Sequence, residues 1–85
     1  MKKHIEWRDD KRAFANGDYG WVGRIKIFWL GYSVINREDK DKPYLLNHEL
    51  PCMKNGQRFE TREAGYEFAE ALLKKFYDHL KENMA

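Results

Sequence analysis

Residues 61–82, TREAGYEFAEALLKKFYDHLKE, are the stretch that decides the fold. Apolar residues recur there three and four positions apart, which places them along one stripe of an α-helix. The stripe contains Ala64, Phe68, Ala69, Leu72, Leu73, Phe76 and Leu80. Thr61 can cap the first turn by accepting a backbone N–H. We therefore predict a C-terminal helix whose apolar stripe needs a flat apolar partner, and only the β-like segments upstream can supply one.

The charged residues of this stretch fit the same helix. Glu63 lies near its N-terminus and Lys81 near its C-terminus, where each complements the helix dipole. We expect Glu67 and Glu70 on the solvent side, with Glu70 paired to Lys74 four residues later.

Residues 21–30 are the strongest strand candidate. In an extended chain, alternate residues share a face. One face then holds Trp21, Gly23, Ile25, Ile27 and Trp29, and the other holds Val22, Arg24, Lys26, Phe28 and Leu30. The first face is the better candidate for the surface beneath the helix, although the pattern leaves both open. Gly31 marks a bulge or a turn after this strand.

Weaker strand patterns flank this segment. Residues 3–7 resemble an edge strand, and Asn16-Gly17-Asp18 forms a turn across which Phe14 and Tyr19 can pair. The same region could instead be a loop packed by its own aromatic rings. Residues 32–37 and 43–50 resemble a hairpin closed by five charged residues, and residues 58–60 lead into the helix.

The predicted fold class is α+β: a three- to four-stranded antiparallel sheet with one C-terminal helix on one face, in the order β-β-β-α. Eighty-five residues form a single domain, 1–85. The formal charge is +2, which permits a nucleic-acid partner without requiring one.

Cys52 is the only cysteine, so no intramolecular disulfide can form and a reducing compartment is expected. No apolar run is long enough to span a membrane, and the first residues lack the apolar centre of a signal peptide. We expect a protein of the cytoplasm of a bacterial host, without a membrane partner.

The sequence shows no catalytic or metal-binding motif. His48 and Cys52 have ligand-like spacing but lack the second pair that a structural zinc site requires. No nucleophile elbow, phosphate-binding glycine loop or zinc-protease motif is present. We therefore expect no catalytic residues, no metal, no cofactor and no enzymatic activity.

Two binding functions remain open. Arg24, Lys26 and Phe28, with Arg37 nearby, interleave cations with a ring, as a sheet needs in order to hold phosphates and stack a base. The alternative is that Arg24 and Lys26 are ordinary solvent-side residues and Phe28 covers the adjacent hairpin.

The second function is protein interaction. The chain has more aromatic rings than one helix can cover, so Tyr19 and Trp29 are candidate contacts for a host or phage protein or for a second copy of the chain. The alternative is that the N-terminal segment folds back over the second face of the sheet.

Several motifs carry a family resemblance. Residues 23–34, Tyr44-Leu45-Leu46, Leu50-Pro51 and Thr61-Arg62-Glu63-Ala64 resemble small phage and prophage proteins of unassigned activity. That resemblance implies a phage origin more than a function. The junction at residues 59–64 also resembles the sheet-plus-helix DNA-binding arm of tyrosine recombinases. This chain differs from the arm in its longer strands and less basic sheet.

Overall fold

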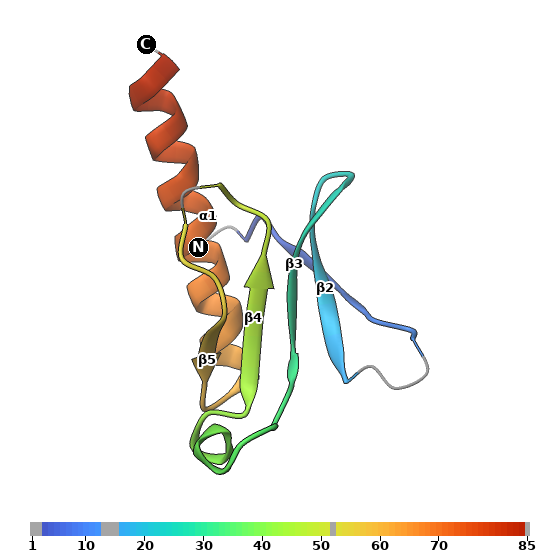
Figure 1. The fold of residues 1–85 in the computed structure, drawn as a ribbon. Coiled ribbons are helices and arrows are strands. Elements are labelled where there is room, and N and C mark those ends of the chain that lie inside the picture. The colour runs from blue at the N-terminus through green and yellow to red at the C-terminus, as the bar shows by residue number, and fades with distance from the viewer. Residues whose placement is uncertain (1–2, 13–15, 52, 85) are drawn as a thin grey trace.

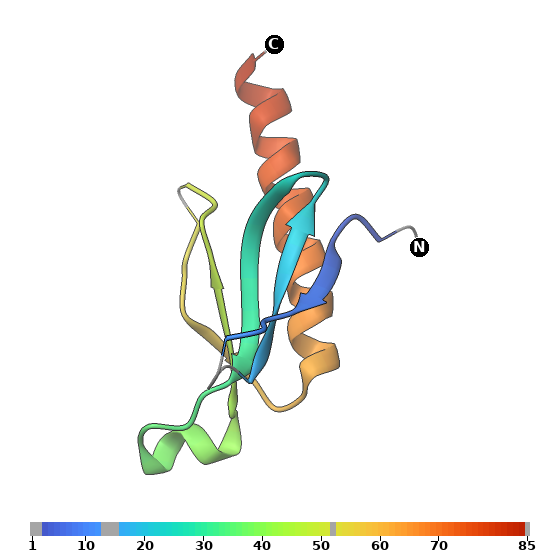
Figure 2. The same ribbon diagram turned by 90° about the vertical axis from the view of Figure 1, so that its right-hand side faces the viewer.

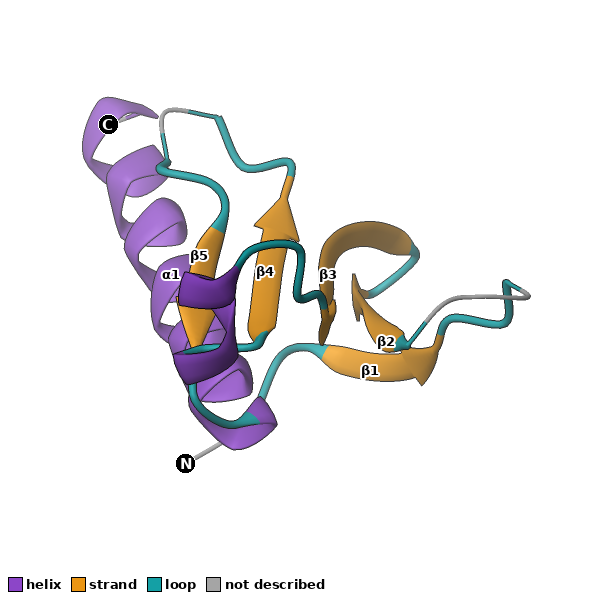
Figure 3. Cartoon of the chain, turned by 60° about the horizontal axis from the view of Figure 1, so that its bottom comes forward, coloured by secondary structure: helices purple, strands orange, loops and turns teal. Residues whose placement is uncertain are grey.

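The computed structural model describes residues 3–12, 16–51 and 53–84. They form an antiparallel sheet of five strands followed by one helix (Figure 1). The strands are β1 (Glu6–Asp9), β2 (Gly17–Val22), β3 (Ile25–Tyr32), β4 (Tyr44–His48) and β5 (Gln57–Phe59), and the helix is α1 (Arg62–Met84). Each strand pairs with the next along the chain. A short 3₁₀ helix, η1 (Arg37–Asp41), lies in the connection between β3 and β4 (Figure 3).

This architecture confirms the predicted α+β class and the C-terminal helix, but the sheet has five strands instead of three or four. The prediction of one strand over residues 21–30 was wrong, because a two-residue turn at Gly23 and Arg24 separates β2 from β3. Gly23 has φ 61°, a conformation that glycine adopts without a steric penalty. The prediction of a break at Gly31 was also wrong, since β3 continues through it to Tyr32.

The other strands also begin and end at different residues from those predicted from the sequence. The segment after Tyr32 is not a strand, and β4 pairs with β3 itself, with Tyr44 opposite Tyr32. Residues 58–60 were expected only to lead into the helix, whereas residues 57–59 form β5 and pair with β4 as an edge strand. Phe14, proposed to pair with Tyr19, lies outside the described residues.

The hydrophobic core lies between α1 and one face of the sheet, which we call the inner face. Phe28, Leu30 and Leu46 are its largest fully buried side chains. The expectation that α1 covers Trp21, Ile25, Ile27 and Trp29 was therefore wrong, because the alternate residues of β3 face the helix. Figure 2 shows α1 crossing this face, with its C-terminal turns extending beyond the sheet.

Small residues let the helix approach the sheet closely. Gly65 and Ala69 are buried, and a Cβ atom at Gly65 would lie 2.7 Å from both terminal methyl groups of Leu30. Leu72 is buried beside them, so this part of the predicted stripe is confirmed. Leu80, near the C-terminal end of α1, is 40% exposed.

Polar contacts hold the N-terminal half of α1 in place. Thr61 Oγ1 accepts the backbone N–H of Ala64 at 3.1 Å, as predicted for the cap. Glu70 does not face solvent or pair with Lys74. Its Oε1 instead accepts the backbone N–H groups of His4 and Ile5, both at 2.8 Å, which ties the N-terminal segment to the helix. Tyr66 and Arg62 both donate to Asp18 of β2.

Replacing Leu30 with alanine tests the central contact of this core. Because Leu30 is fully buried, we expect Leu30→Ala to lower the free energy of unfolding by about 2–5 kcal/mol. Ile35→Ala is the matched control, since Ile35 is 82% exposed, and it should change stability by less than about 0.5 kcal/mol. Urea unfolding followed by circular dichroism measures both. Equal effects of the two substitutions would contradict the assignment of the core.

Candidate functional site

The face of the sheet opposite α1, here called the outer face, carries a row of polar and aromatic side chains. Directly paired residues of antiparallel strands lie on the same face. The register pairs Arg8 with Tyr19, Tyr19 with Trp29, and Trp29 with Asn47. These four residues therefore run across β1 to β4 as one line.

Trp29 lies over the backbone of two strands at the middle of this row. A Cβ atom at Gly31 would lie 2.6 Å from Cζ2 and Cη2 of the indole, and one at Gly17 would lie 2.8 Å from Cζ2. Gly17 and Gly31 face each other across β2 and β3. The indole thus occupies space that any other residue at these two positions would fill, and this explains both glycines.

A buried carboxylate holds the indole in this position. Trp29 Nε1 donates a hydrogen bond of 3.0 Å to Asp10, whose side chain is buried. Arg12 donates to the same carboxylate from its backbone N–H and from Nε and Nη2, the last at 2.6 Å. The guanidinium hydrogen bonds of Arg12 outweigh burial and lower the pKa of Asp10 to about 2. Asp10 is therefore charged at neutral pH, and it fixes Trp29 at one end and Arg12 at the other.

Cations lie against the neighbouring rings. Lys26 Nζ is 4.1 Å from the centre of the Tyr19 ring, and the guanidinium carbon of Arg12 is 5.7 Å from the same centre. The guanidinium carbon of Arg8 is 4.9 Å from the Trp21 ring. Each distance is within the range of a cation–π contact. The outer face of β1 to β3 thus carries aromatic rings with positive charges beside them.

A hollow of about 350 Å³ adjoins Trp29, here called the outer-face hollow. It opens between β3, the end of β4 and the loop that follows β4. Its lining includes Tyr19, Lys26, Trp29, Asn47, Glu49 and Asn55. One wall is aromatic, and the others carry an ammonium, a carboxylate and amide groups, so the hollow can contact both a flat ring and polar atoms.

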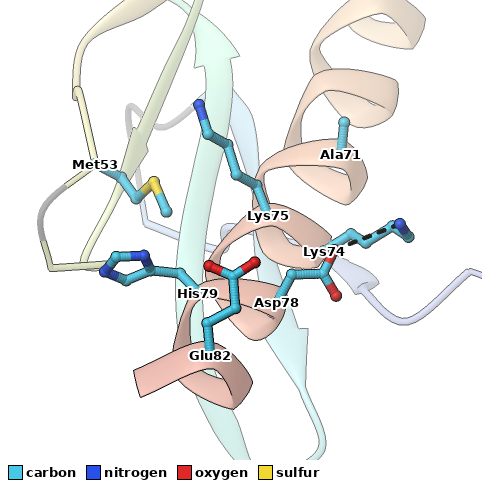
Figure 4. A pocket seen from close by; sticks show the side chains of 7 residues that line it. All are labelled: Met53, Ala71, Lys74, Lys75, Asp78, His79 and Glu82. Carbon is cyan, nitrogen blue, oxygen red and sulfur yellow. Dashed lines mark hydrogen bonds and ion pairs between the residues drawn. The ribbon is translucent and has the colours of Figure 1, made fainter.

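A second hollow, of about 600 Å³, lies between α1 and the connection from β4 to β5 (Figure 4). Its lining contains Met53, Ala71, Lys74, Lys75, Asp78, His79 and Glu82. The charges there are mixed, and Lys74 is 3.5 Å from Asp78. The described residues hold no group of three or more His, Cys, Asp or Glu side chains placed to bind a metal ion.

The residues predicted to bind nucleic acid do not form one site. Phe28 is 1% exposed and packs in the core, so its predicted role in stacking a base was wrong. Arg24 lies in the turn before β3 and Arg37 in η1 after it, at opposite ends of that strand. Lys26 is the one member of the set on the outer face.

The structure instead brings Lys26 together with Tyr19 and Trp29. The sequence indicated Tyr19 and Trp29 as contacts for a protein partner. The structure adds Arg8, Arg12 and Asp10, which sequence reasoning missed. Period-2 alternation in residues 6–9 would have placed Arg8 correctly, because Arg8 alternates with the apolar Trp7. Nothing in the sequence pairs Asp10 with an indole nineteen positions away.

The structure also shows where His48 and the N-terminal segment lie. His48 is buried on the inner face, where Nδ1 accepts the N–H of Leu50 at 3.1 Å and Nε2 lies 2.8 Å from the Lys54 carbonyl oxygen. Both ring nitrogens of His48 therefore make hydrogen bonds within the protein. Cys52 lies outside the described residues. Residues 3–5 run along the helix side, so in the described part of the chain they do not cover the outer face.

Comparisons with known protein families, with curated proteins and with solved structures find no match for this chain. Across residues 3–12, 16–51 and 53–84, no helix has the length and apolar character needed to cross a membrane.

The Asp10 contact predicts a specific pH response. Its pKa of about 2 lies below the ordinary 3.8, so the charged carboxylate stabilises the fold above about pH 4 and this contribution is lost as pH falls toward 2. The indole N–H resonance of Trp29, followed by NMR, should therefore titrate with a midpoint near 2. Asp10→Asn should remove the titration. A midpoint at the ordinary carboxyl value would show that Arg12 does not hold the charge.

Proposed function

We propose that this protein binds nucleic acid through the outer face of its sheet. The observation that carries the proposal is the row in which Tyr19 and Trp29 lie beside Lys26 and Arg12 on a face that α1 leaves uncovered. Aromatic rings stack on bases, and neighbouring cations contact phosphates. The face therefore offers both kinds of contact that a nucleic-acid strand needs.

The charges of the face support a moderate, salt-dependent affinity. Arg8 and Arg12 are paired with Glu6 and Asp10, but each guanidinium has five N–H donors and keeps some of them available. Within the described part of the chain, Lys26 has no carboxylate within salt-bridge distance. With between one and three cations on phosphates, a rise from 50 to 200 mM salt should weaken binding by roughly 3- to 40-fold.

A protein partner is the competing function for the same surface. Tyr, Trp and Arg are the residues that most often dominate protein interfaces, and Tyr19, Trp29 and Arg8 lie together here. The partner would be a host or phage protein or a second copy of the chain. The exposed Lys26 favours nucleic acid over a protein partner, because lysine is depleted in the centre of protein interfaces.

Substituting Lys26 tests the proposal without disturbing the core. Fluorescence anisotropy of a labelled mixed-sequence oligonucleotide should show weaker binding by Lys26→Ala and a salt dependence reduced by about one phosphate contact. Lys40→Ala is the matched control, since Lys40 is exposed in η1 and does not line the outer-face hollow, and it should bind as the unchanged protein does.

Three outcomes would count against nucleic-acid binding. They are the absence of any anisotropy change at 50 mM salt, equal losses for Lys26→Ala and Lys40→Ala, and a dimer in light scattering that dissociates when Trp29 is replaced. The last result would assign the outer face to contacts between copies of the chain.

A further inference from the structure

We infer that the outer face takes unpaired nucleotides, with one base stacked on Trp29 and its polar edge in the outer-face hollow. This rests on the proposed function and deepens it, because it specifies single-stranded nucleic acid as the ligand. The inference is carried by two features that lie side by side: an indole fixed against the sheet, and a hollow that adjoins it.

Trp29 is preorganised for stacking. Its benzene ring rests on the backbone at Gly17 and Gly31, and its Nε1 is bound by Asp10, so the ring cannot turn away without losing both contacts. Trp29 is only partly buried, so part of the indole surface is accessible to a ligand. A base stacking there meets a surface whose position is already set, and little conformational entropy is lost on binding.

The outer-face hollow gives the base edge a place to bind. Its volume of about 350 Å³ is at the lower end of the roughly 300–1,000 Å³ typical of small-molecule sites, which suits a single nucleotide. Lys26 and the amide of Asn47 can donate to ring nitrogen or carbonyl acceptors, and Glu49 can accept from an amino group. Asn55 is already engaged, since its side chain bonds both backbone groups of His48.

The same geometry disfavours a duplex. Proteins that read double-stranded DNA insert side chains into a groove about 8.5 Å deep, where they meet base edges. Trp29 is held against the backbone at Gly17 and Gly31 by its benzene ring and against Asp10 by Nε1, so it does not project as a free side chain that could enter a groove. In a duplex the faces of the bases are already stacked on one another, so an indole in this position has no partner.

Three ligands of equal length separate the contribution of base stacking from that of phosphate contacts. We would measure binding of a labelled single strand, of the same strand annealed to its complement, and of an abasic strand that keeps every phosphate. Tryptophan fluorescence should be quenched by the single strand. We expect the single strand to bind about 10- to 100-fold more tightly than the abasic strand, the range that stacking of one base provides.

Two substitutions locate the stacked base. Trp29→Phe keeps a ring and should retain part of the preference for the single strand, whereas Trp29→Leu should abolish it and bind single and abasic strands alike. Tyr77→Leu is the matched control, because Tyr77 is 60% exposed at the far end of α1, and it should leave the preference unchanged. Circular dichroism confirms that each variant is folded.

The outcomes distinguish this inference from the proposed function. If the duplex or the abasic strand binds as tightly as the single strand, and Lys26→Ala still weakens all three, the face binds phosphates only and the inference fails while the proposed function stands. If none of the three ligands binds at 50 mM salt, both fail.

Discussion

The packing of α1 on Phe28, Leu30 and Leu46 is the constraint on which the rest of the structure depends. One helix can cover only one face of a sheet, and this one approaches closely enough to bury that face because Gly65 adds no side chain above Leu30. The opposite face is not covered by α1. The same contact that supplies the hydrophobic core therefore also creates the surface that we assign to a ligand.

The helix could be predicted from sequence because its stripe, its cap and its length all agree. The face of the sheet beneath it could not, because the two alternating sets in residues 21–30 are both partly apolar. Counting apolar residues favoured the face with Trp29 over the face with Phe28 and Leu30. The glycine turn at Gly23 and the register shift at Gly20 and Trp21 then changed which residues share a face, and neither irregularity is visible in a period-2 pattern.

Part of the candidate site could be predicted from the sequence. Lys26, Tyr19 and Trp29 were each selected, but for two different partners, and only the pairing of β2 with β3 brings them together. Phe28 was selected because it alternates with Lys26, and the structure buries it. Asp10 could not have been found, because a carboxylate among other charged residues gives no sign that it will be buried against an indole.

A buried charge next to an exposed site has a cost that the fold must offset. Removing a carboxylate from water is unfavourable unless it receives several hydrogen bonds, and Asp10 receives them from Arg12 and from Trp29. A neutral acceptor would fix the indole without that cost. The charge does more, because it also holds the guanidinium of Arg12 near the Tyr19 ring. Asp10 thus holds the Trp29 ring and the Arg12 cation at a fixed spacing, and the function that we propose depends on these two groups staying together.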